Sequence, residues 1–203
     1  MGQSSAAQLR IRPMAARDIP AVVQLQVAFL NGSIVTQLGP AFLTRFHAVA
    51  LAHPASRGFV AELDGMIAGF ALGSLDVHAF NAHMKPRILC AMITALLAPS
   101  RISLAVSLVR MVFEGEPQPT IPAELLLLTV DPRARRGGVG RGLLGALERS
   151  FREQGVERYR VAVRSQLVEA KAFYEALRFE HEQDRTVLGL PMTYLTKQVR
   201  ASA

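Results

Sequence analysis

Two spacings of apolar residues divide the chain into expected helices and expected strands. Apolar side chains recur at helical spacing in residues 19–30, 40–52, 138–154 and 167–177. Alternating or short continuous apolar runs predict strands at residues 9–13, 58–63, 66–73, 124–130, 159–163, 179–184 and 187–198. Helices and strands mixed in this order predict a single domain over residues 1–203, of α/β class, in which helices flank a twisted sheet.

Turn-forming residues fall between these elements. Asp64 and Gly65 separate two apolar runs, which is a strong signal for a tight β-hairpin. Asp18 precedes the first helical pattern as an N-cap, and Gly155 follows the helix over residues 138–154 as its C-terminal stop.

Residues 76–122 interrupt the pattern and are read as a helical insertion. They hold apolar helical stretches at residues 86–98 and 100–113, followed by a proline-rich link. Each stretch is too short to span a membrane, so no transmembrane span is expected. Extra core packing is the simplest role, whereas a pocket cover, a homodimer face or a membrane-surface contact are the alternatives.

Composition and charge narrow the function classes. Half of the residues are apolar and 19% are charged, which is typical of a globular protein. The formal charge is +7, but the arginines are scattered apart from a group at residues 133–141. This surface suits anionic small molecules. A nucleic-acid partner is not expected, because the sequence has no recognisable nucleic-acid-binding motif. Cys90 alone cannot form an internal disulfide, and with no secretory signal a cytoplasmic location is expected.

A glycine-rich segment directly follows the expected strand over residues 124–130. Gly137, Gly138, Gly140 and Gly142 open the helix over residues 138–154. A turn of this kind directs backbone N–H groups and a helix N-terminus to one point, which suits phosphate. The spacing fits neither G-x-G-x-x-G nor G-x-x-x-x-G-K-[ST], so neither dinucleotide binding of that type nor Mg²⁺-dependent NTP hydrolysis is expected.

The spacing does fit [RQ]-x-x-G-x-[GA], with Arg135, Gly138 and Gly140 at the fixed places. With this loop the sequence resembles the GCN5-related N-acetyltransferase (GNAT) superfamily. The resemblance implies a mostly antiparallel sheet and acetyl-CoA as co-substrate, its diphosphate held by the loop and its thioester beside the preceding strand. The cofactor-binding residues so implied are Leu128, Thr129, Val130, Arg135, Arg136, Gly137, Gly138, Val139, Gly140, Arg141 and Gly142. Backbone N–H groups near residues 128–130 are expected to meet the oxyanion.

A second stretch, residues 170–179, matches the family pattern A-x-x-F-Y-E-x-x-G-F except at the glycine. By resemblance, Tyr174 donates a proton to the departing thiolate, and a phenol protonated to about pH 10 is a credible acid. Phe173 is expected to pack in the core. Leu167 replaces a common asparagine, so a hydrogen bond to the pantetheine arm is expected to be missing. Arg178 replaces the usual glycine and puts the tight turn out of the helix in doubt.

The acceptor amine must lose a proton, and Glu124 is the candidate base. Glu124 precedes Arg135 by an offset similar to that of the base carboxylate in histone-acetylating members of the family. A carboxylate at the start of an apolar strand could have a raised pKa, although a solvent-exposed strand-end glutamate is an equal alternative. Asp76 and His78 are further candidates, and no histidine spacing indicates a metal.

Three functions are compatible with these residues. The first is acetyl-CoA-dependent N-acetyl transfer to the primary amine of a small molecule, by direct transfer in a ternary complex. The second uses a protein or peptide amine as acceptor. The third is a non-catalytic acyl-CoA-binding regulator, which Leu167 favours and Tyr174 disfavours.

Overall fold

The computed structural model describes residues 8–30, 33–96, 120–187 and 189–199, and its chain divides into two compact units. The first unit comprises Met1–Gly73 and Leu127–Ser150, and the second comprises Ser74–Leu126 and Phe151–Ala203. Strand β4 (Glu124–Val130) and helix α6 (Val139–Glu153) supply residues to both units. The expectation of a single domain stays a prediction.

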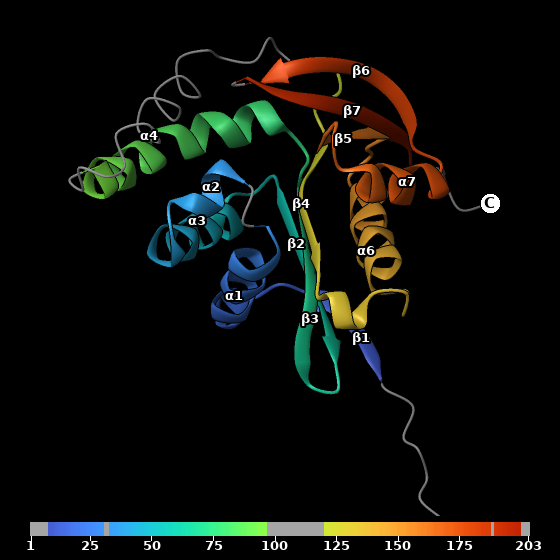
Figure 1. The fold of residues 1–203 in the computed structure, drawn as a ribbon, viewed down its shortest axis with the longest axis horizontal. Coiled ribbons are helices and arrows are strands. Elements are labelled where there is room, and N and C mark those ends of the chain that lie inside the picture. Colours follow the sequence, from blue (N-terminus) through green and yellow to red (C-terminus); the bar gives the residue numbers. More distant parts are fainter. Residues whose placement is uncertain (1–7, 31–32, 97–119, 188, 200–203) are drawn as a thin grey trace, which may run out of the picture. The chain divides into compact units, whose positions relative to one another are not determined.

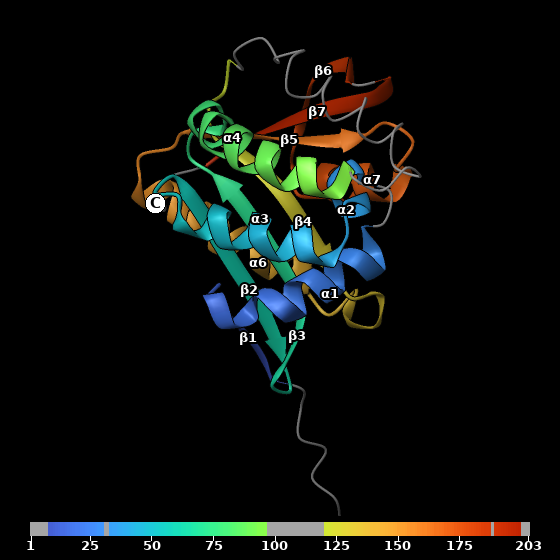
Figure 2. The same ribbon diagram turned by 90° about the vertical axis from the view of Figure 1, so that its left-hand side faces the viewer.

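The first unit is built on the strand order β1-β2-β3-β4. Its strands are β1 (Leu9–Pro13), β2 (Ser56–Leu63), most of β3 (Met66–Ser74) and the end of β4. Its helices are η1 (Ala16–Asp18), α1 (Ile19–Phe29), α2 (Ile34–Gln37), α3 (Pro40–Ala52), η3 (Pro132–Ala134) and most of α6. Helices α1 and α3 cover one face of these strands and α6 covers the other (Figures 1 and 2).

Local chemistry explains the start of this unit. Asp64 and Gly65 form the predicted hairpin turn with φ of 51° and 80°, and β1 pairs antiparallel to β2. Arg12 on β1 binds Asp18 at 2.6 Å and Glu62 at 2.5 Å, so one guanidinium joins β1, β2 and the start of α1. These hydrogen bonds lower the pKa of Asp18.

The second unit continues from the start of β4 in the strand order β4-β5-β7-β6. Its other elements are α4 (Val77–Leu96), β5 (Arg158–Arg164), α7 (Val168–Ala176), β6 (Glu180–Val187) and β7 (Leu190–Gln198). Strand β5 runs parallel to β4 and antiparallel to β7, and β6 is antiparallel to β7. Tyr159 is fully buried and meets Phe151 and Phe179 in edge-to-face contacts. A mixed, mostly antiparallel α/β fold is thereby confirmed.

The insertion differs from its prediction. The expected helix at residues 86–98 belongs to α4, which begins already at Val77 and carries Pro86 inside it. Asp76 starts this helix, since its Oδ1 accepts a hydrogen bond from the Ala79 N–H at 3.0 Å. The expected helix at residues 100–113 lies outside the described residues. Within the described ranges, no helix has both the length and the apolar character needed to cross a membrane.

Helix α7 ends in a tight turn despite Arg178. The Arg178 N–H donates to the Glu175 carbonyl at 2.9 Å, and the Phe179 N–H donates to the Tyr174 carbonyl at 3.1 Å. These bonds define a Schellman motif, in which the residue at the Arg178 position adopts the left-handed conformation. Arg178 does so with φ of 64°, and the Tyr174 and Phe179 rings meet at 5.0 Å. The doubt raised by the missing glycine was therefore wrong.

Replacing Arg178 with glycine is expected to stabilise the protein. The left-handed conformation costs a residue with a Cβ about 1–2 kcal/mol, and glycine removes this cost while losing more entropy on folding. The net gain is expected to be about 1 kcal/mol, or about 2–4 °C in Tm. Thermal unfolding measures it. Arg149→Gly, inside α6, is the control: the same exchange in a right-handed helix should lower Tm.

Candidate active site

The glycine-rich segment joins the end of β4 to the start of α6 through an ordered turn. The Asp131 N–H donates to the Ala68 carbonyl on β3 at 2.8 Å, which fixes the end of the strand. The Asp131 carboxylate then accepts the Arg133 N–H at 2.9 Å and the Arg133 side chain at 2.7 Å. These hydrogen bonds fix the direction in which the chain leaves the sheet. They also pair the Arg133 guanidinium with Asp131.

The backbone of residues 136–138 alternates between the left-handed conformation and other conformations. Arg136 has φ of 66° and Gly138 has φ of 78°, while Gly137 between them lies outside the left-handed region. Alternation of this kind turns successive N–H groups toward one point and forms an anion-binding concavity, or nest. A Cβ on Gly138 would meet nothing within 4 Å, so the backbone conformation, not space, is what requires this glycine.

The amides of this segment have unused donor capacity. Among the residues that the structure describes, the N–H groups of residues 136–141 donate no hydrogen bond to a protein acceptor. The first helical bond of α6 runs from the Gly142 N–H to the Gly138 carbonyl at 2.8 Å. A helix N-terminus with free amides attracts anions.

Gly142 lies close to the edge strand β1, and its predicted role in cofactor binding stays a prediction. Its N–H is already used inside α6, and a Cβ at this position would collide with Ile11 Cδ1 of β1. The glycine therefore serves close packing between the helix and the edge strand. The other residues predicted to bind the cofactor in this loop stay predictions as well.

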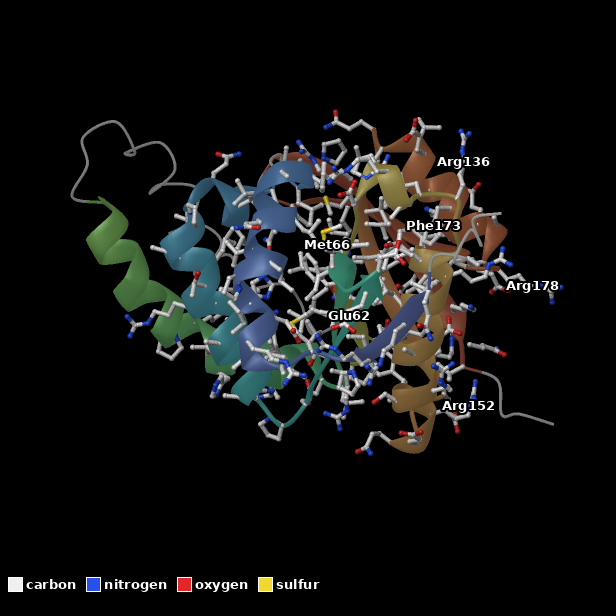
Figure 3. The ribbon with its side chains drawn as sticks, turned by 90° about the horizontal axis from the view of Figure 1, so that it is seen from below. Glu62, Met66, Arg136, Arg152, Phe173 and Arg178 are labelled. Atoms are coloured by element: carbon white, nitrogen blue, oxygen red, sulfur yellow. The ribbon has the colours of Figure 1, made fainter. Side chains whose placement is uncertain are left out.

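Three exposed arginines surround the free amides, namely Arg135, Arg136 and Arg141. Figure 3 shows the Arg136 side chain reaching away from the ribbon. Unlike Arg133, none of the three has an ion-pair partner among the described residues. The loop therefore combines donor amides with exposed positive charge, which suits a doubly charged phosphate group.

The end of β4 is closely packed on one edge and weakly paired on the other. A Cβ on Gly69 of β3 would lie 2.8 Å from the Thr129 carbonyl, so β3 and β4 approach closely there. On the other edge, the parallel ladder with β5 pairs Glu124 with Arg160 and Leu125 with Val161, and no later pair is found among the described residues.

Tyr174 lies in the buried core of the second unit. It is 7% exposed, and its ring contacts Phe173 at 5.3 Å and Phe179 at 5.0 Å. Burial raises the pKa of its phenol, so the hydroxyl stays protonated well into the alkaline range. No described residue forms a hydrogen bond with this hydroxyl. Phe173, labelled in Figure 3, is half-buried and so does not belong to the fully buried core that was expected for it.

Glu124 is neither a solvent-exposed residue nor an isolated carboxylate. It is 9% exposed, and its Oε2 accepts hydrogen bonds from the Arg160 side chain at 2.7 Å. Arg160 is itself 2% exposed and stacks over the Tyr194 ring at 4.8 Å. Of the two other candidate bases, Asp76 caps α4 and His78 is exposed.

Two buried polar groups were not singled out from the sequence. Arg160 carries the only charge within the apolar run over residues 159–163, and a buried arginine requires a carboxylate partner. His47 is fully buried, and its Nε2 lies 2.7 Å from Gln26 Oε1, whose side-chain amide donates to Thr36 at 3.2 Å. Burial lowers the pKa of His47 to about 4, so it is neutral at pH 7.

Comparison with known proteins identifies the family. The family model described as "Acetyltransferase (GNAT) family" matches residues 30–179. The chain belongs to the GNAT acetyltransferase family. It is therefore an acyltransferase that uses acetyl-CoA as co-substrate, as the loop and the residues around Tyr174 predicted by resemblance.

Solved GNAT structures share this fold at low sequence identity. SsHAT matches with a TM-score of 0.70 and 22% identity, over 95% of this chain and 99% of the other. The paiA N-acetyltransferase of Thermoplasma acidophilum, in complex with coenzyme A, matches with a TM-score of 0.61 and 14% identity, over 94% and 99%. YncA of Salmonella typhimurium, with its cofactor acetyl-CoA, matches with a TM-score of 0.60 and 16% identity, over 96% of both chains. No curated protein sequence matches the chain.

Across the described ranges, no group of three or more His, Cys, Asp or Glu side chains is placed to hold a metal ion. The roles predicted for the loop amides, the end of β4, Tyr174 and Glu124 stay predictions.

Proposed function

We propose that the protein transfers the acetyl group of acetyl-CoA directly to the primary amine of a small molecule, with both substrates bound together. The observation that carries the proposal is the loop over residues 136–141, whose amides have no protein acceptor among the described residues. These amides sit at the N-terminus of a long helix and fit a diphosphate by charge and geometry. Arg135, Arg136 and Arg141 supply the countercharge.

The donor thioester is proposed to lie beside residues 128–130. The short ladder between β4 and β5 supports this, because a strand edge without a partner can bind an extended ligand like an additional strand. Backbone N–H groups of this strand would then stabilise negative charge on the thioester oxygen during the reaction.

Two side chains are proposed to move protons. The amine nitrogen forms a bond to the acetyl carbon while the carbon–sulfur bond breaks, so the amine loses a proton and the thiolate gains one. Tyr174 donates the proton to sulfur, which its raised pKa and its unpartnered hydroxyl support. Glu124 is proposed as the acceptor of the amine proton, directly or through water.

The insertion at residues 76–122 is the reason for proposing a small acceptor rather than a peptide. Helix α4 belongs to this insertion, and the proposal predicts that the insertion leaves no room for an extended chain at the acceptor site. The test is a panel of amines assayed by thiol release, with peptides carrying free N-termini and lysines as the second arm. Faster turnover of peptides would overturn the small-acceptor proposal. Coenzyme binding without turnover of any amine would favour the regulator.

The loop is tested by replacing Gly138 with valine. A β-branched residue cannot hold φ of 78° without strain, so the nest should open and coenzyme A should bind about tenfold more weakly or worse. Isothermal titration calorimetry measures the Kd. Gly155→Val is the matched control, since Gly155 follows α6 with φ of 74° and open space around it. It should carry the same backbone cost and leave the Kd unchanged. Equal weakening in both variants would contradict the assignment.

A further inference from the structure

Thr129 carries a buried hydroxyl without a partner in the part of the chain that the structure describes. Thr129 is 4% exposed, and its Oγ1 forms no hydrogen bond with any described residue. An unsatisfied buried hydroxyl is destabilising, and valine has nearly the same shape without this cost. By contrast, the buried Thr36 hydroxyl accepts a hydrogen bond from Gln26. Such a group needs an explanation, and because Thr129 lies in the stretch proposed to hold the thioester, a ligand atom is the candidate partner.

The direction of the Thr129 side chain indicates which ligand this is. Leu127, two residues earlier on β4, packs against the buried cluster that includes Val22 and Leu25 of α1. Side chains two residues apart on a strand share a face, so the Thr129 hydroxyl also faces the α1 side. Val130 faces the other way, since its Cγ2 and Leu143 of α6 both lie next to Gly69.

The two faces of this part of the sheet therefore carry different groups. Helix α6, with the loop proposed for the diphosphate at its N-terminus, covers one face, and α1 and α3 cover the other (Figures 1 and 2). A diphosphate at the start of α6 cannot be the missing partner of Thr129 on the opposite face. The extended part of acetyl-CoA is proposed to pair with the edge of β4, in the plane of the sheet and not over the α1 face. The ligand left for this face is the amine, whose N–H groups are donors for a hydroxyl oxygen.

We propose that the Thr129 hydroxyl accepts a hydrogen bond from the acceptor amine and so orients its nitrogen toward the thioester. The inference rests on the proposed function and adds an acceptor-binding side chain to it. It assigns the residue two distinct roles: its backbone lines the donor, whereas its side chain contacts the acceptor. Loss of the hydroxyl should then weaken binding of the acceptor amine and leave binding of acetyl-CoA unchanged.

The experiment compares Thr129→Val and Thr129→Ser in the whole protein, with the best amine of the panel as probe. Thr129→Val should raise Tm by about 2–4 °C, because it removes an unsatisfied group. It should also raise the KM for the amine about tenfold and leave the KM for acetyl-CoA within about twofold. The Tm increase that saturating amine produces in the original protein should shrink in the valine variant. Thr129→Ser should restore the amine KM.

Ser56→Ala is the matched control. Ser56 Oγ is also buried without a partner, but it lies at the start of β2. This variant should be neutral or stabilising and should leave both KM values unchanged. If Thr129→Val stabilises the fold and changes neither KM, the hydroxyl serves no ligand and the inference fails. If it changes only the KM for acetyl-CoA, the hydroxyl belongs to the donor side and the inference also fails. If the original protein acetylates no amine, the proposed function fails instead.

Discussion

Tyr174→Phe is expected to lower kcat about 100-fold or more while the Kd for coenzyme A stays unchanged. The exchange removes only the phenolic oxygen. The ring contacts with Phe173 and Phe179 remain, so the core of the second unit should be preserved. A thiolate that leaves without a positioned acid must take its proton from water, and this slows the step in which the carbon–sulfur bond breaks.

The protonation state of Tyr174 determines how kcat should depend on pH. Tyr174 acts as an acid only while protonated, and burial raises the pKa of its phenol. The acid form is therefore fully present at neutral pH and persists above the ordinary phenol pKa of about 10. We therefore expect the kcat of the original protein and that of the phenylalanine variant to depend on pH in the same way below about pH 10.

Tyr159→Phe serves as the comparison. Tyr159 is a fully buried tyrosine in the same unit, and it has no proposed part in the chemistry. Its variant should keep kcat within about twofold, since only core packing and one hydroxyl change. Similar losses of kcat in both variants would indicate a damaged core rather than a missing acid. An unchanged kcat in Tyr174→Phe would exclude the phenol as the acid.

The elements of this fold could largely be predicted from the sequence because local chemistry determines them. The Asp64-Gly65 turn, the apolar strand over residues 124–130 and the helix closed by Gly155 each depend on neighbouring residues alone. Helix α4 was placed too late because Pro86 was read as a helix start, although the helix continues through it from Val77. Proline is usually a boundary, and only tertiary context overrides that preference.

The site could be predicted where it depends on the backbone and not where it depends on distant side chains. The free amides over residues 136–141 follow from glycine spacing. The use of Gly142 for packing depends on Ile11, which lies far away in the sequence and adjacent in space. Likewise, the partner of Glu124 follows from the register of β4 against β5, which pairs it with Arg160. No local pattern encodes such a register.

The buried pair of Glu124 and Arg160 predicts the largest effect on stability. Breaking a buried ion pair by removing one partner typically costs about 3–5 kcal/mol, because the remaining charge loses its ion-pair partner in a low-dielectric interior. Glu124→Gln and Arg160→Met should each lower the free energy of unfolding by about this amount. The double variant should lose far less than the sum, because no charge stays behind and methionine can still cover Tyr194. Urea denaturation of the original protein and the three variants measures the coupling.

The same double variant tests whether Glu124 is the base. A single Glu124→Gln variant cannot decide this, since a slow enzyme could simply be a poorly folded one. In the double variant the fold is largely restored while the carboxylate is absent. If Glu124 accepts the amine proton, kcat should stay about 100-fold below that of the original protein near neutral pH. It should recover as the pH rises toward the pKa of the amine, where the neutral amine forms without help. Recovery of kcat together with the fold at pH 7 would instead show that Glu124 acts only as the partner of Arg160.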